Sequence, residues 1–391
     1  MRYNFDKVID RSGTSAEKVE GLKHIWGRTD LIPLWVADMD FATAPFVTDA
    51  IRKRCENEVL GYTGKPDSYY NAIINWVKQR YDLVVAKEMI NFVPGIVPGI
   101  GMAMNCFTQK GDKVMIQPPV YHPFAWVTTR NERTLVTNPL KWENGMYRMD
   151  LNSFRDQIKG CRLCILCNPH NPGGVVWTEA ELRAIADICY DEKVLVFSDE
   201  IHADLTLPPH THRPFATVSE KARMNSVTFM SPSKAFNMPG LSASHALIFN
   251  EDLRKRFRIY MDAGELDMGH VFAFLSVEAA YSHGTEWLDQ CLAYIQGNID
   301  FVDDFLKNHA PKIKAIRPGA SYLVWLDCRE LKLSQKDLNE FFVDKAHLAL
   351  NDGEMFGKEG IGFMRLNVAS PRCIIEKAMK QLADAYQLYI K

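Results

Sequence analysis

The sequence predicts an α/β protein with a large domain, built on a mostly parallel sheet covered by helices on both faces, plus a smaller α+β domain. Short apolar segments typical of buried strands recur through the middle of the chain. Segments with helical periodicity separate several of them, and a long helical stretch then leads into a second mixed region. The chain has 391 residues, enough for roughly two to three units of about 150 residues each.

The buried strands of the large domain are expected to be short and bounded by polar or turn residues. They cover residues 113–117, 163–166, 194–197, 227–230 and 245–249. The clearest helix between them is predicted over residues 178–190, because Thr178 and Glu181 form a capping-box pattern. Its apolar stripe consists of Leu182, Ile185, Ala186 and Cys189.

The remaining segments predict the smaller domain. A long helix is expected over about residues 281–307, and it is followed by strands and helices in alternation. These cover residues 322–326 and 363–368 as strands, and 336–347 and 371–389 as helices. We therefore predict a large domain over residues 46–285 and a small domain formed by residues 1–45 and 286–391, with no internal repeat.

Composition argues against several classes of function. Lys and Arg number 46 and Asp and Glu 48, which gives a net charge of −2 and no electrostatic case for nucleic acid or an anionic membrane. The sequence has neither the apolar core of a signal peptide nor a run of about 18 apolar residues. Nine scattered cysteines then favour free thiols in a reducing cytoplasm.

Two groups of residues have metal-like spacing, but neither predicts a metal site. Cys161, Cys164 and Cys167 fall in a predicted strand, where Cys164 and Cys167 would point to opposite faces. His210 and His212 lie between prolines, so a loop is the simpler interpretation.

An aspartate and a lysine follow neighbouring predicted strands. Asp199 comes after residues 194–197, and Lys234 comes after residues 227–230, flanked by Ser231 and Ser233. Ligands of open α/β sheets bind at the carboxyl ends of strands. A lysine among hydroxyls opposite a carboxylate suits pyridoxal phosphate (PLP), which takes the amine as a Schiff base and the carboxylate at its pyridinium nitrogen. Taken singly, Asp199 could cap a turn and Lys234 could be a surface residue.

Three further features fit such a site. Residues 168–174 contain two Asn-Pro pairs and a Gly-Gly, which make a rigid loop. Residues 95–101 are Gly-rich and precede a helix-like stretch, so their N–H groups could bind a phosphate, and a plain loop is the alternative. Arg365, inside a predicted strand, needs an anionic partner, either a substrate carboxylate or a structural salt bridge.

The order and spacing of these features resemble the fold-type I PLP enzymes, the aspartate aminotransferase superfamily (class I/II), from about Pro33 to the C-terminus. Three segments are most similar to the cystathionine β-lyase, or C–S lyase, branch: PLWVADMDF (33–41), SDEIH (198–202) and LNDGEMFG (350–357). The resemblance implies the PLP-dependent transferase fold, PLP as cofactor and an amino acid as substrate.

The resemblance also implies roles for single residues. Lys234 would form the Schiff base, Asp199 would pair with the pyridinium and Asn171 would bind the phenolic oxygen, with His202 close by. Tyr121 would stack on the ring. The phosphate would be bound by Ile96, Val97, Ser231 and, from the neighbouring subunit of a homodimer, Tyr62; Ser233, which flanks Lys234, could donate to it as well. The substrate would contact Ala37 and Arg365.

Two positions depart from the aspartate aminotransferases. His202 stands where those enzymes carry tyrosine, and Ser242 stands where they carry an arginine that grips the phosphate. Both departures count against an ordinary transaminase and agree with the lyase branch.

The expected activity is α,β-elimination of cystathionine or related S-substituted cysteines to a thiol, pyruvate and ammonia, with Lys234 as general base. The alternative is an aminotransferase acting on a neutral or aromatic amino acid. A non-catalytic PLP-binding regulator is a third interpretation, but regulators of that kind usually carry an added DNA-binding segment.

Overall fold

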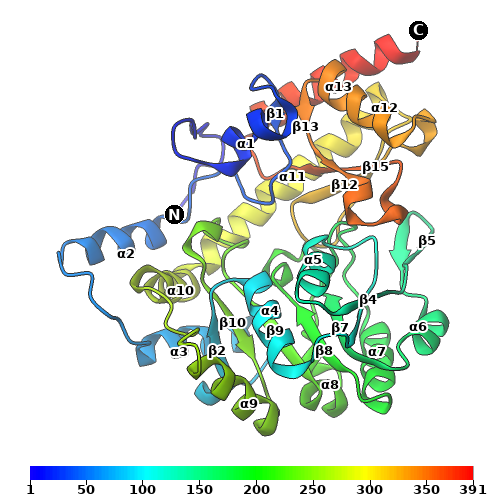
Figure 1. Ribbon diagram of the computed structural model, residues 1–391. Coiled ribbons are helices and arrows are strands. Elements are labelled where there is room, and N and C mark those ends of the chain that lie inside the picture. Colours follow the sequence, from blue (N-terminus) through cyan, green and yellow to red (C-terminus); the bar gives the residue numbers. More distant parts are fainter. Residues whose placement is uncertain (391) are drawn as a thin grey trace.

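The computed structural model describes residues 1–390 and contains a seven-stranded sheet that confirms the predicted fold class (Figure 1). Only β10 runs antiparallel to its neighbours; the other pairs are parallel. In spatial order the strands are β2 (Ile90–Val93), β10 (Ser244–Leu247), β9 (Ser226–Met230), β8 (Leu195–Asp199), β7 (Cys161–Cys167), β3 (Lys113–Ile116) and β4 (Thr134–Thr137). The five predicted strands are β3, β7, β8, β9 and β10.

Helices cover both faces of this sheet, which explains why its strands read as continuous apolar runs. One face packs against α4 (Ile96–Phe107), α5 (Pro123–Arg130) and α9 (Glu251–Asp262). The other packs against α6 (Leu151–Gln157), α7 (Glu179–Asp191) and α8 (Glu220–Met224). Cys164 faces α7 and Cys167 faces the α4 side, as strand alternation requires.

Helix α7 forms where the sequence predicts it. The Thr178 hydroxyl accepts a hydrogen bond from the backbone N–H of Glu181, whose carboxylate accepts from the backbone N–H of Thr178. The predicted apolar stripe of Leu182, Ile185, Ala186 and Cys189 is buried against the sheet. The capping box therefore fixes the start of the helix, and the stripe fixes its orientation.

The smaller unit is a four-stranded sheet flanked by helices. Its strand order is β11 (Lys314–Ile316), β12 (Leu323–Asp327), β15 (Phe363–Asn367) and β14 (Asn351–Asp352). Helices α11 (Thr285–His309) and α13 (Arg372–Ile390) pack together beside it. The N-terminal segment joins this unit through β1 (Ile32–Pro33), which pairs with β13 (Leu348–Ala349). The domain limits at residues 46 and 285 stay a prediction.

Two predicted helices have different limits in the structure. The helix expected over 281–307 is interrupted at Gly284, which separates α10 (Val271–His283) from α11. A Cβ at Gly284 would lie 2.3 Å from the ring of Phe236, so close packing requires a glycine there. The helix expected over 336–347 consists of α12 (Gln335–Glu340) and a π-helical turn that ends at Lys345.

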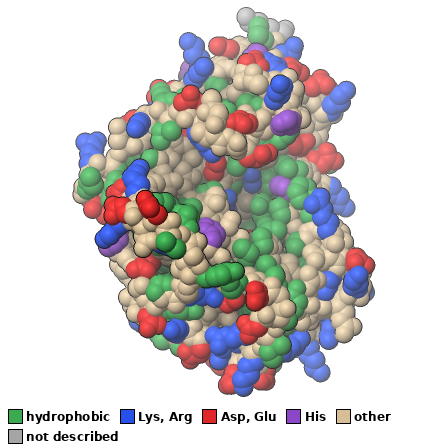
Figure 2. Space-filling model, turned by 60° about the vertical axis from the view of Figure 1, so that its left-hand side comes forward, with side chains coloured by type: hydrophobic (Ala, Val, Ile, Leu, Met, Phe, Trp, Pro, Cys, Tyr) green, Lys and Arg blue, Asp and Glu red, His purple; other side chains and the backbone are tan. Residues whose placement is uncertain are grey.

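The remaining elements surround these two sheets: α1 (Glu17–Trp26), α2 (Pro45–Cys55), α3 (Asp67–Tyr81), β5 (Lys141–Glu143) and β6 (Met146–Arg148). Within residues 1–390, no helix is both long and apolar enough to cross a membrane. The face of the molecule in Figure 2 is hollowed between its upper and lower parts.

Candidate active site

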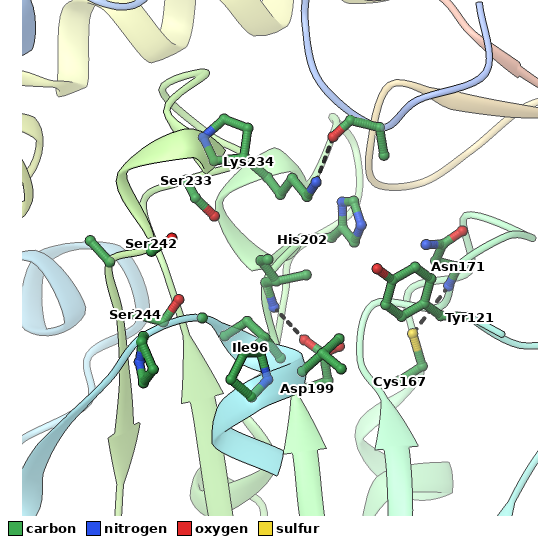
Figure 3. Close-up of a pocket in the computed structure, with 18 residues that line it drawn as sticks. Ile96, Tyr121, Cys167, Asn171, Asp199, His202, Ser233, Lys234, Ser242 and Ser244 are labelled. Carbon is green, nitrogen blue, oxygen red and sulfur yellow. Dashed lines mark hydrogen bonds between the residues drawn. The ribbon is translucent and has the colours of Figure 1, made fainter. Parts of the chain in front are cut away.

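A cavity of about 210 Å³ lies at the edge of the large sheet where the parallel strands end (Figure 3). The residues around it come from the turns after β2, β3, β7, β8 and β9, from the start of β10, and from the N-terminal segment through Ala37. Of the residues predicted for the site, the cavity is lined by Ala37, Ile96, Val97, Tyr121, Asn171, Asp199, His202, Ser233 and Lys234.

Lys234 extends into this cavity from the turn after β9. Its Nζ donates a hydrogen bond of 2.5 Å to the carbonyl oxygen of Ala37 (Figure 3). Burial lowers the pKa of the amine to about 8; Asp38 and Asp199 oppose this effect, and the charge of Arg365 adds to it. A lysine in this state has an appreciable neutral fraction near neutral pH, as a nucleophile or general base requires.

Asp199 ends β8 and is only 3% exposed. Its Oδ1 accepts a hydrogen bond of 3.1 Å from the backbone N–H of Ile201. Burial raises the pKa of the carboxyl to about 7; the Ile201 N–H and Lys234 lower it, while Glu200 raises it further. Since a buried carboxylate is costly without a cation, the position suits a protonated ring nitrogen placed in the cavity.

Tyr121 and His202 present rings to the same space, and both are held in their neutral forms. Burial, with the charge of Asp199 as a smaller cause, raises the pKa of Tyr121. Burial also lowers the pKa of His202 to about 3, and its Nδ1 has no hydrogen-bond partner among residues 1–390. Because both side chains are uncharged, they can pack against a flat ring in the cavity without adding a charge of their own to the site.

The opposite end of the cavity offers donors for an anion. Gly95, with φ of 132°, precedes α4, so the free backbone N–H groups of the first turn, including those of Ile96 and Val97, face this end. The hydroxyls of Ser233, Ser242 and Ser244 line the same region. Among the described residues lining the cavity, Lys234 is the only cationic side chain, so a phosphate here would be bound by backbone and hydroxyl groups.

Ser231 does not line the cavity in this chain. Its hydroxyl donates 2.7 Å to the carbonyl of Ala243 and lies 2.9 Å from the hydroxyl of Ser233. It therefore supports the position of Ser233. Ser244 also lines the cavity, although no sequence motif marks it. It lies at the amino end of β10, and because β10 is antiparallel, that end meets the carboxyl ends of the other strands.

Arg365 lies on β15 of the small sheet; it does not line the cavity itself but contacts Asn171, which does. It donates to Asn171 Oδ1 at 3.1 Å, to the Trp35 carbonyl at 3.1 Å and to Asn351, while its Nε has no partner. Burial lowers the pKa of the guanidinium to about 10. No acidic residue in the described chain forms an ion pair with Arg365, so the structural salt bridge is absent there and the buried guanidinium has no anionic partner.

The carbonyl of Ala37 is fixed by two donors, Lys234 and the hydroxyl of Tyr322 at 2.9 Å. The neighbouring acids are occupied elsewhere: Asp38 pairs with Arg11 at 2.6 Å, and Asp40 pairs with the buried Lys18 at 2.8 Å. The sequence does not indicate this role for Tyr322, because a tyrosine directly before a strand carries no distinctive signal.

Tyr62, by contrast, is 99% exposed and lies outside the cavity of its own chain. A role for it at a phosphate therefore depends on a second subunit.

The donor set of the cavity fits PLP: an amine of lowered pKa, a buried carboxylate, stacking and hydrogen-bonding groups between them, and an anion-binding end.

A family model described as aminotransferase class I and II matches residues 29–382. Cystathionine beta-lyase PatB of Bacillus subtilis (strain 168) is 38% identical over 384 residues, covering 98% of this chain and 99% of that protein.

Solved structures agree with this match. Cystalysin from Treponema denticola, whose crystal structure contains a pyridoxal 5′-phosphate cofactor, is 33% identical, with a TM-score of 0.96 and 100% of both chains covered. The PLP-bound C–S lyase from Staphylococcus hominis is 35% identical, with a TM-score of 0.91, covering 99% of this chain and 98% of that one. The chain belongs to the aminotransferase class I and II family.

Proposed function

We propose that this protein is a PLP-dependent carbon–sulfur β-lyase. Its substrate is cystathionine or a related S-substituted cysteine, which α,β-elimination converts to a thiol, pyruvate and ammonia. The observation that carries the proposal is the buried Lys234 amine, which lies in one cavity with the Asp199 carboxylate. The similarity to PatB and to the C–S lyase from Staphylococcus hominis, over nearly the whole chain, favours this reaction within the family.

In this proposal, each group of side chains in the cavity would bind one part of PLP. Asp199 would bind the pyridine nitrogen, Asn171 the phenolic oxygen and Tyr121 the ring face. The N-terminus of α4 and the hydroxyls of Ser233, Ser242 and Ser244 would bind the phosphate, with Ser231 holding Ser233 from behind. When bound, the cofactor supplies an electron sink for the negative charge that develops at the substrate Cα.

The chain itself binds the substrate and moves the proton. Arg365 has an unpaired Nε and no acidic partner in the described chain, and it would bind the α-carboxylate in a two-pronged contact through Nε and the Nη that now donates to Trp35 and Asn351. Nζ of Lys234 takes the Cα proton as general base, and the fixed carbonyl of Ala37 orients this amine.

A homodimer completes the site in this proposal. Tyr62 follows two other exposed apolar residues, Val59 at 72% and Leu60 at 59% exposure. Exposed apolar groups gathered in one segment are typical of a surface that a partner covers. We place the second subunit over this segment, with Tyr62 reaching the partner's phosphate site.

The nine cysteines are all free thiols, which supports a cytoplasmic location.

The decisive test is the release of pyruvate and thiol from L-cystathionine, with PLP present and no 2-oxo acid added. Equal amounts of pyruvate and thiol from the wild type, and none from Lys234→Ala, would support the lyase. Absence of product, followed by amino-group transfer once a 2-oxo acid is supplied, would reject the lyase in favour of an aminotransferase. Light scattering of the purified protein tests the dimer.

A further inference from the structure

Glu200, next to Asp199, points away from the cavity. Side chains alternate along an extended segment, so Ser198 and Glu200 share the face opposite to that of Asp199. The Ser198 hydroxyl donates 2.8 Å to Oε1 of Glu200, and Val196, two residues before Ser198 on β8, packs on the α7 side of the sheet. The turn that carries Asp199 is therefore held from behind by a second acid, which has no part in the proposed reaction.

His212 supplies the partner of this buried acid. Its Nε2 lies 2.7 Å from Oε2 of Glu200, and the two side chains are 1% and 0% exposed. The backbone N–H of Phe215 donates 2.8 Å to the remaining oxygen of Glu200. A carboxylate only accepts, so Nε2 of His212 carries the proton of this bond. All three donors converge on Glu200.

Further hydrogen bonds connect the segment around His212 to the two strand ends that present side chains to the cavity. Asn168, which opens the rigid loop leading to Asn171, donates 3.1 Å to the carbonyl of Arg213, next to His212. The backbone N–H of Asn168 also donates 2.9 Å to the carbonyl of Asp199. The loop of residues 208–214 is thus fastened to both strand ends, β7 and β8, that present side chains to the cavity.

The carboxylate of Asp199 has few constraints of its own. Its one hydrogen bond from the described chain comes from the N–H of Ile201. Ile201 directly follows Glu200, whose N–H is bound to the carbonyl of Phe229 at 2.9 Å. If the side chain of Glu200 were released, the turn of residues 199–201 could rotate, and the carboxylate would lose its alignment.

We propose that Glu200 and His212 form a positioning pair that fixes the orientation of Asp199 toward the pyridine nitrogen of PLP. The inference deepens the proposed function and rests on it. It gives a role to one histidine of the His210-Thr-His212 motif, which resembles a metal pair in sequence. His212 also lies beside the ring of Tyr81, with 5.5 Å between the ring centroids, and near the buried Asp204, which accepts a hydrogen bond from Tyr81.

The experiment compares His212→Phe, Glu200→Gln and the matched control His210→Phe, since His210 is exposed and two residues away. Each protein is prepared with and without PLP. The readouts are the dissociation constant for PLP, the pH midpoint of the bound cofactor's absorption and the thermal unfolding of the cofactor-free protein.

We expect His212→Phe to bind PLP about tenfold more weakly, because it leaves a buried acceptor without its donor. The pH midpoint of the bound cofactor's absorption should also differ from that of the wild type. His212→Gln, which keeps a donor, should recover most of both properties, and His210→Phe should match the wild type. Glu200→Gln keeps the oxygen that accepts hydrogen bonds from Ser198 and from the N–H of Phe215. It should therefore fold, and it takes the place of His212→Phe if that variant does not fold.

An unchanged PLP affinity and absorption midpoint, with only the unfolding temperature lowered, would overturn the inference and leave the pair a purely structural contact. Failure of the wild type to bind PLP would instead overturn the proposed function together with the inference. The two failures are therefore distinguishable in one set of titrations.

Discussion

Replacing Lys234 by methionine should abolish activity and yet stabilise the cofactor-free protein. The amine is buried enough to lower its pKa from 10.5 to about 8, so folding disfavours the ammonium. At about 1.4 kcal/mol per tenfold change in proton affinity, this costs on the order of 3 kcal/mol at neutral pH. The figure is an upper bound because Nζ borders a cavity that admits water. Methionine keeps the stem of the side chain without the charge.

The stability difference between Lys234→Met and the wild type should depend on pH. Below about pH 8 the amine is charged in both the folded and the unfolded protein, and the full cost is present. Between about pH 8 and 10.5 the unfolded chain retains a proton that the folded chain has released, so the wild type gains stability as the pH rises. The advantage of Lys234→Met should therefore be largest near neutral pH and nearly lost above pH 10.5.

The assay is urea unfolding of the cofactor-free wild type and variant at about pH 7 and about pH 10. Lys53→Met serves as the control, because Lys53 is exposed, and it should change stability little at either pH. A Lys234→Met variant less stable than the wild type at neutral pH, or an advantage that does not change with pH, would refute a burial cost at this amine.

Three further outcomes follow from the site. Asp199→Asn should lower kcat for elimination by a factor of about a hundred or more, which steady-state pyruvate release measures; an unchanged kcat would exclude its proposed role. Arg365→Lys should raise KM about tenfold with a smaller effect on kcat, because lysine cannot make the two-pronged contact; equal KM values would place the substrate carboxylate elsewhere. Gly174→Ala should destabilise the fold by about 1–3 kcal/mol, since φ is +65° and the added Cβ would lie 2.4 Å from Pro318 Cβ. Thermal unfolding tests this, and Gly240→Ala, with open space around it, is the control.

The sequence alone determined the fold class and the centre of the site. Apolar runs marked the strands, and the polar residue after each run marked the edge of the sheet. Because the carboxyl ends of parallel strands meet at one edge, Asp199 and Lys234 had to approach each other. The start of α7 was equally determined, since its capping box and its apolar stripe are both local patterns.

Only the tertiary structure decided which polar groups face the cavity. Ser231 and Ser244 have the same side chain, yet the hydroxyl of Ser231 is taken by the Ala243 carbonyl, whereas Ser244 enters the site from the antiparallel strand β10. In the same way, Glu200 finds its partner His212 twelve residues away. Local periodicity tells which face of a strand a side chain occupies; its partner depends on which distant segment packs against that face.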